Sequence, residues 1–93
     1  MRFGFTDLNL FRHIVEAGSI THGAERSNLA LAAASTRIRK MELAFGTELL
    51  VRGRQGVVPT QAGRTLLQHA RGILAQVERL QEDLTPYARG LAG

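Results

Sequence analysis

Cationic side chains concentrate in the middle of the chain, where they could bind an anion. Arg37, Arg39, Lys40, Arg52 and Arg54 fall within one short stretch that contains only two acidic residues. Two short hydroxyl side chains, Ser35 and Thr36, come directly before them. Guanidinium and ammonium groups bind phosphates, and hydroxyl groups can donate to or accept from base edges. These residue types are therefore suited to binding a nucleic acid, provided that the fold brings them to one surface.

The sequence offers little for catalysis or for metal binding. It contains no cysteine, which excludes disulfides, thiolate zinc sites and cysteine nucleophiles. The histidines, His13, His22 and His69, lack the spacing of metal ligands, and no nucleophile stands beside a base in a recognisable motif. We therefore expect no enzyme activity, no cofactor and no metal.

Length and composition fit one small domain with one additional element. The 93 residues are 44% hydrophobic and carry a net charge of +4, which favours an anionic partner. No apolar run approaches the roughly 18 residues that a membrane span needs. The N-terminus is a poor signal peptide, because no continuous apolar segment leads to a small-residue cleavage site. We expect a cytoplasmic protein with no membrane partner.

Helical periodicity predicts the first two elements that must position the cations. Apolar residues three and four apart predict a helix from Asp7 to about Ala17, with Thr6 or Asp7 as its N-cap. A second, short helix follows, and Thr21 is its expected N-cap. Gly23 inside that helix is unfavourable by about 1 kcal/mol relative to alanine. Its presence predicts close packing against a neighbouring helix.

A third helix is predicted from about residue 30 to residue 45. Its buried stripe is expected to comprise Ala34, Ile38, Met41 and Phe45. At about 100° per residue, the opposite side carries Ala32, Thr36, Arg39 and Leu43, flanked by Ser35 and Lys40. Small residues allow close approach to base edges, and the later cations can meet phosphates. The short preceding helix and turn favour a helix-turn-helix over a merely solvated amphipathic helix.

The period then changes from helix to strand. Short apolar runs at residues 49–51 and 57–58 surround a turn with two glycines, which predicts a small β-hairpin. Arg52 and Arg54 lie near its tip, where they could reach a phosphate or a minor groove.

A long last helix is predicted from Gln61 to about Leu84, with Thr60 as its N-cap. Its apolar residues alternate spacings of four and three, the pattern of a heptad seam. Such a helix packs either on its own domain or on a second chain, and we favour a two-helix dimer. Pro86 and the tail to Gly93 are expected to end the helix and form a linker.

Taken in order, several sequence pieces resemble the DNA-binding end of the LysR-type transcriptional regulators. The resemblance runs from about residue 8 to residue 74 and rests on FRHIVEAGS (11–19), GAER (23–26), FGTELL (45–50), PTQAG (59–63) and ARGIL (70–74). It implies a mainly α fold with a winged helix-turn-helix over residues 1–60, where the helix-turn-helix spans about 20–40 and the wing about 49–59. A linker and dimerisation helix with a tail would occupy residues 61–93.

The resemblance also implies a function. Regulators of this type bind double-stranded promoter DNA sequence-specifically as homodimers on interrupted palindromic sites. The third helix would enter the major groove, and the wing would meet the flanking minor groove or backbone. Full-length members sense a small-molecule effector through a C-terminal domain that is absent here, so we expect a DNA-binding fragment or a truncated member.

Two sets of functional residues are therefore predicted in this chain, one for DNA binding and one for dimerisation. The predicted DNA contacts are Thr21, Leu31, Ala32, Ser35, Thr36, Arg37, Arg39, Lys40, Arg52 and Arg54. The predicted dimer interface is Leu66, Ala70, Ile73, Val77, Leu80 and Leu84.

The start of the third helix departs from the family pattern. Leu29-Ala30-Leu31-Ala32 stands where Val-Ser-Gln-Pro is common, so Asn28 is expected to cap the helix instead. Leu31 or Ala32 could contact a thymine methyl group, and Thr36 stands where arginine is frequent. We therefore expect a sequence preference that differs from the family average.

Two alternative functions stay open at this point. The chain could be a helical dimerisation and interaction module with an incidental basic face, or a winged-helix regulator of another family, such as the molybdate-responsive regulators. The PTQAG and ARGIL pieces favour the LysR type over other winged-helix families. Binding to duplex DNA at moderate salt would separate a regulator from an interaction module.

Overall fold

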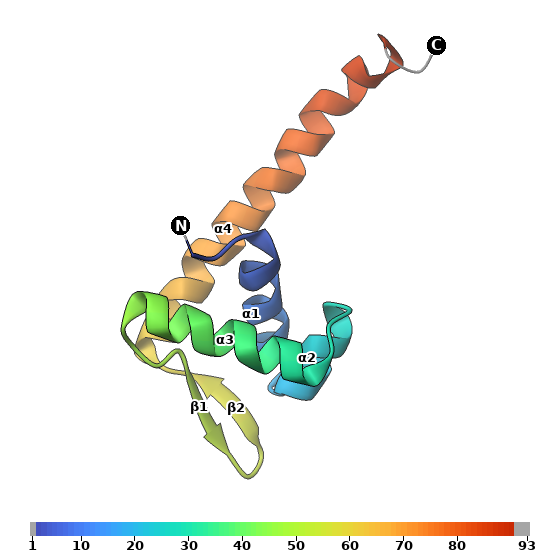
Figure 1. Ribbon diagram of the computed structural model, residues 1–93. Coiled ribbons are helices and arrows are strands. Elements are labelled where there is room, and N and C mark those ends of the chain that lie inside the picture. Colours follow the sequence, from blue (N-terminus) through green and yellow to red (C-terminus); the bar gives the residue numbers. More distant parts are fainter. Residues whose placement is uncertain (1, 91–93) are drawn as a thin grey trace.

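Four α-helices, a two-stranded hairpin and a short 3-10 helix make up residues 2–90, the part of the chain that this computed structural model describes. They are α1 (Phe5–Ala17), α2 (Ile20–Arg26), α3 (Leu31–Phe45), β1 (Leu50–Gly53), β2 (Gly56–Pro59), α4 (Gln61–Leu84) and η1 (Thr85–Gly90). In Figure 1, α1, α2 and α3 pack together, the hairpin projects from one side, and α4 extends away as a rod. This mainly α winged helix-turn-helix is the predicted fold class.

The core forms where α1 is enclosed by the other helices and the root of the hairpin. Its largest fully buried side chains are Leu10, Phe11, Ile14, Ile38, Met41 and Leu49. From α4 the core receives Leu67 and Ala70, which lie on the side of that helix that faces α1. The three- and four-residue spacings therefore predicted most of the buried faces of α1 and α3, including Phe11 and Ile14 in α1 and Ala34, Ile38 and Met41 in α3.

Gly23 lies where α2 crosses α1, as its place in the sequence predicts. A Cβ atom at this position would come within 2.6 Å of the Cα atom of Ile14. No real Cβ contact is that short, so a side chain here would force the two helices apart. Close packing therefore accounts for a glycine in the middle of a helix.

The predicted N-caps of the first three helices were wrong. Gly4, and neither Thr6 nor Asp7, is the N-cap of α1, and the carboxylate of Asp7 instead accepts the Gly4 N–H at 2.9 Å. The N-cap of α2 is Ser19, whose hydroxyl accepts the N–H of His22 at 3.2 Å. The N-cap of α3 is Ala30, without a side-chain hydrogen bond.

Asn28 and Phe45 also differ from their predicted roles. Asn28 does not cap α3, because it has φ 56°, a left-handed conformation that turns the chain between α2 and α3. Asparagine tolerates this conformation better than most residues. Phe45 is 43% exposed, because the last turn of α3 runs beyond the core. Its ring packs on that of Phe3, with centroids 4.9 Å apart.

The hairpin and the start of α4 agree with the sequence. The antiparallel strands pair Leu50 with Pro59 and Gly53 with Gly56, which leaves Arg54 and Gln55 at the tip. The hydroxyl of Thr60 accepts the N–H of Gly63 at 2.9 Å, which confirms it as the N-cap of α4. It also donates to the Glu48 carbonyl at 2.7 Å and so ties the hairpin root to the helix.

The C-terminal end of α4 lies close to its predicted position. The α-helix ends at Leu84, two residues before Pro86, and continues into the 3-10 helix η1. The last residues of the predicted tail, 91–93, lie outside the described part of the chain.

Candidate nucleic-acid interface

The side of α3 that faces away from the core is a surface of small and cationic side chains. Ala34, Ile38 and Met41 are buried, whereas Thr36 and Arg39 are exposed. Exposed residues on this outer side also include Ala32, Lys40 and Leu43, and Ser35 at its edge is partly buried. The predicted division of α3 into an inner and an outer face is therefore present.

Two further predicted DNA contacts, Leu31 and Thr21, are also exposed. Leu31 is 50% exposed, so an apolar side chain large enough to touch a base methyl group lies at the first turn of α3. Thr21 is exposed in the first turn of α2. Because Ser19 caps that helix, the Thr21 hydroxyl is not needed for capping.

Electrostatics favour an anion on the outer face of α3. Arg39 and Lys40 are both exposed there. The one acidic residue of α3, Glu42, is turned toward the hairpin root, where its carboxylate accepts the Leu49 N–H at 2.8 Å. The acid therefore serves an internal hydrogen bond, while the cations face solvent.

Arg37 has an additional role that the sequence did not reveal. Its guanidinium donates to the carboxylate of Asp7 at 3.0 Å and joins α3 to the first turn of α1. The Arg37 side chain stays 41% exposed in this ion pair. A guanidinium has five N–H donors, so Arg37 can hold Asp7 and still offer donors to a phosphate.

The hairpin places two further cations beside α3. Arg52 and Arg54 are exposed at the end of the hairpin that is distant from the core. Leu50 and Val57 are buried and anchor the hairpin to the helices. The N–H of Val57 also donates to the carbonyl of Gly18, in the turn between α1 and α2, at 3.1 Å. This hydrogen bond fixes the wing relative to the helix-turn-helix.

Two of these positions were missed as site-forming residues. Asp7 was expected only to cap α1, and Gly18 was not among the predicted site residues. The partners of these residues, Val57 and Arg37, lie far along the sequence, and no local pattern indicates either contact.

The predicted dimer seam on α4 divides into two parts. Ala70 is 0% exposed within its own domain, so it has no surface left for a partner chain and is a core residue instead. Leu66 and Val77 are partly buried, and Ile73, Leu80 and Leu84 are exposed. Exposed apolar residues therefore continue along α4 beyond the domain. Ala70 is no longer counted among the predicted interface residues.

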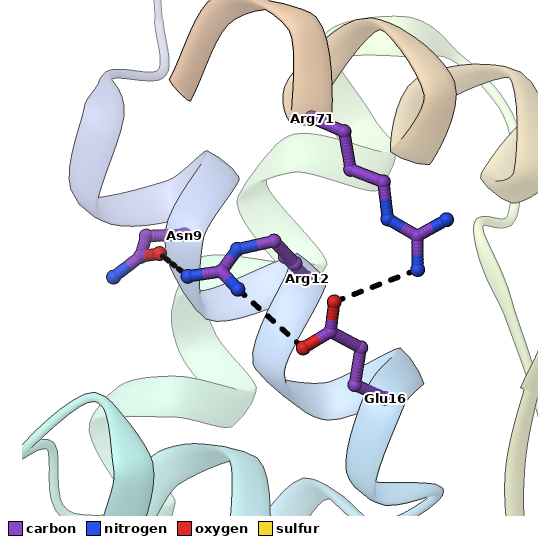
Figure 2. A network of polar contacts seen from close by, with 4 residues as sticks. All are labelled: Asn9, Arg12, Glu16 and Arg71. Atoms are coloured by element: carbon purple, nitrogen blue, oxygen red, sulfur yellow. Dashed lines mark hydrogen bonds and ion pairs between the residues drawn. The ribbon is translucent and has the colours of Figure 1, made fainter. Parts of the chain in front are cut away.

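A polar network fixes α4 relative to α1. Figure 2 shows Glu16 between two arginines, with its oxygens 3.4 Å from the Arg12 guanidinium and 3.5 Å from that of Arg71. Arg12 also donates to Asn9 at 2.6 Å. The Arg71 contact is the part of this network that joins α4 to α1. It helps to set the direction in which α4 leaves the domain.

Neither a metal site nor a membrane-spanning helix is present within residues 2–90. No group of three or more histidine or acidic side chains is arranged to hold a metal ion there. None of the helices in this range has an apolar stretch long enough to cross a lipid bilayer.

Comparisons with known proteins agree with this geometry. The nitrogen assimilation regulatory protein nac of Escherichia coli (strain K12) is 38% identical over 89 residues, which are 96% of this chain and 29% of that protein. The chain thus spans less than a third of the length of this relative.

Solved structures share the same fold. The BenM DBD/benA site 1 DNA complex has a TM-score of 0.86 at 28% identity and covers 95% of this chain and 99% of that one. The CbnR DBD–DNA complex has a TM-score of 0.83 at 28% identity and covers 92% of this chain and 99% of that one. Residues 5–64 match the family described as bacterial regulatory helix-turn-helix protein, lysR family. The chain therefore belongs to the LysR family of bacterial helix-turn-helix regulators.

Proposed function

We propose that this chain binds an interrupted palindromic site in double-stranded promoter DNA as a homodimer and so regulates transcription. In each subunit, α3 enters the major groove and the wing meets the flanking minor groove or backbone. The observation that carries the proposal is the outer face of α3, where Arg39 and Lys40 face solvent while Glu42 is held at the hairpin root.

The shape of this surface supports base contact as well as phosphate contact. Ala32 and Thr36 are exposed and short, so the α3 backbone can come close to base edges. The wing adds two further exposed cations, Arg52 and Arg54. The hydrogen bond between Val57 and Gly18 keeps these two parts in one orientation, so a single DNA duplex can meet both. The likeness to structures of DNA complexes adds to this argument.

An apolar groove beside α4 supports the homodimer. It encloses about 550 Å³ and is lined by Phe3, Leu8, Phe45, Leu49, Leu66 and Ile73, among others. Further along α4, Leu80 and Leu84 are 55% and 56% exposed and form a ridge on the same side of the helix. Exposed apolar surface of this kind is typical of an interface.

The positions of groove and ridge favour antiparallel α4 helices. The groove lies along the first half of α4 and the ridge along the second half. Two antiparallel copies would place the ridge of each chain in the groove of the other. If a two-fold axis relates the copies, the two contacts are equivalent and form together. The α3 helices would then face the same duplex from symmetric positions, as a palindromic site requires.

Salt-dependent DNA binding tests the proposal. If Arg39, Lys40, Arg52 and Arg54 supply about three phosphate contacts per subunit, a dimer neutralises about six phosphates. Log affinity against log salt should then fall with a slope near −5. Fluorescence anisotropy with a duplex pool of random sequence measures this slope. A slope near zero would favour an interaction module over a regulator.

Selection of bound sequences from the same pool tests whether the chain binds an interrupted palindromic site as a dimer. The proposal expects two inverted half-sites with a fixed spacing. A single unpaired half-site, bound by a monomer, would contradict the dimeric arrangement.

A further inference from the structure

The short segment before α1 is held against α3. The Phe3 ring packs on the Phe45 ring near the end of α3, with centroids 4.9 Å apart. The N–H of Gly4 donates to one carboxylate oxygen of Asp7 at 2.9 Å, and the other oxygen accepts from Arg37 of α3 at 3.0 Å. Phe3 and Gly4 therefore both have fixed positions, and Arg2 directly precedes them.

Arg2 lies at a hollow on the surface of α3. The hollow measures about 540 Å³ and is lined by Arg2, Asp7, Ala32, Ala33, Thr36, Arg37 and Lys40. Three of these side chains are cationic, and the one acid is already paired with Arg37. Among the described residues, Arg2 has no ion-pair partner. A positive hollow with a hydroxyl group at its edge is suited to a phosphate oxygen.

This hollow lies on the flank of α3 that is away from the wing. Glu42 marks the wing side, because its carboxylate holds the N–H of Leu49 at the hairpin root. At about 100° per residue, Lys40 lies roughly 160° from Glu42 around the helix axis. The outer face of α3 is therefore bordered by the wing arginines on one side and by Arg2 and Lys40 on the other.

We propose that Arg2 and Lys40 together bind a backbone phosphate of duplex DNA on the flank of α3 opposite the wing. The inference rests on the proposed function. A helix in a major groove is bordered by the phosphate backbones of both strands. The wing would serve one backbone and the segment before α1 the other, so that α3 is held from both sides.

Arg2→Gln removes this charge with little risk to the fold, because Arg2 is exposed. Arg79→Gln is the matched control, since Arg79 is an exposed arginine on α4 that bonds only to Gln76 within residues 2–90. Arg2→Lys keeps the charge. Affinity for a random-sequence duplex is measured by fluorescence anisotropy between about 50 and 200 mM KCl, a range over which phosphate contacts change affinity strongly. Any affinity tag is placed at the C-terminus.

For a dimer, Arg2→Gln is expected to make the slope of log affinity against log salt shallower by at most about 1.8, or about 0.9 per chain, because Lys40 stays beside the same phosphate. Arg2→Lys should restore most of that slope, and Arg79→Gln should leave it near the wild-type value. If Arg2→Gln matches Arg79→Gln while the wild-type chain binds DNA normally, the Arg2 contact is wrong and the proposed function stands. If the wild-type chain shows no salt-dependent binding, the proposed function fails and this inference fails with it.

Discussion

The N–H of Val57 in the wing donates to the carbonyl of Gly18 in the turn between α1 and α2, with the nitrogen and oxygen 3.1 Å apart. This hydrogen bond joins the hairpin to the helix-turn-helix at a point where no side chain intervenes. The approach is close because Gly56, next to Val57, has no Cβ atom. It also has φ 122°, which other residues rarely adopt.

Gly56→Ala should therefore loosen the wing. The new Cβ atom would clash with the carbonyl of Gly18, and the backbone would be strained as well. We expect the free energy of unfolding to fall by about 1–3 kcal/mol, measured by urea denaturation, and the affinity for DNA to fall with it. Gly53→Ala is the control, because its Cβ atom would meet only the Gly56 oxygen, at 3.9 Å. Equal effects of the two variants would show that the Gly18 contact does not hold the wing.

Two glycines inside helices should respond to alanine with opposite signs. Gly23→Ala places a Cβ atom 2.6 Å from the Cα atom of Ile14, so it should destabilise the fold by about 1–3 kcal/mol. Gly72→Ala in α4 meets nothing within 4 Å and should raise stability by roughly 0.5–1 kcal/mol through helix propensity. Thermal and urea unfolding measure both. A stable Gly23→Ala variant would mean that α1 and α2 can separate without loss of packing.

Stability should depend on the protonation of His13. Burial is the largest cause that lowers the pKa of His13 below its ordinary value of about 6.5, and the neighbouring Arg12 adds to it. The unfolded chain therefore takes up this proton more readily than the folded one. As pH falls below about 6.5, the free energy of unfolding should decrease, and it should level off below the folded pKa.

His13→Gln should remove this part of the pH dependence, as measured by urea unfolding at neutral and mildly acidic pH. His22→Gln is the matched control, since His22 is exposed on α2. If the free energy of unfolding of His13→Gln decreases at acidic pH as much as that of the wild type, other groups cause the pH dependence.

The elements of the fold were predictable from sequence, because buried faces repeat with the period of a helix or a strand. The N-terminal ends of the first three helices were not. Ser19 and Thr21 are both good N-caps by residue type, and only the path of the chain after α1 selects Ser19. Ala30 begins α3 without a side-chain cap, a case that residue preferences do not predict.

The outer face of α3 was predictable in the same way, but the side-chain pair that joins α1 to α3 was not. Asp7 and Arg37 lie 30 positions apart, and their pairing depends on how α1 crosses α3. Ala70 on α4 shows a second limit of prediction from the sequence pattern. A heptad pattern marks residues that need an apolar partner, but it does not distinguish the chain's own core, which buries Ala70, from a second chain.

Dimerisation should depend on the ridge of α4. Leu80→Asp places a charge in the proposed apolar interface and should give monomers with much weaker DNA affinity. Ala75→Asp is the control, because Ala75 is exposed and lies roughly 140° from Leu80 around α4. Sedimentation equilibrium at tens of micromolar distinguishes the two forms. A monomeric wild-type chain, or a dimeric Leu80→Asp variant, would count against the ridge as the interface.

Reading of base pairs should depend on Thr36 and, to a lesser degree, on Ser35. Thr36 is exposed in the middle of the outer face, whereas Ser35 is partly buried at its edge. A hydroxyl group can donate or accept, so each residue discriminates weakly on its own. Thr36→Ala should change the preference at one base pair by about 1 kcal/mol or somewhat more, and Ser35→Ala by less.

Profiles of selected binding sites measure this change, with Thr85→Ala at the far end of the chain as the control. Affinity for random DNA should stay near the wild-type value, because neither substitution removes a cation that neutralises a phosphate. The opposite result is equally informative. If the selected sites of Thr36→Ala match those of the wild type while affinity for every sequence drops, Thr36 positions α3 on the backbone, and the base contacts must come from other residues of the outer face.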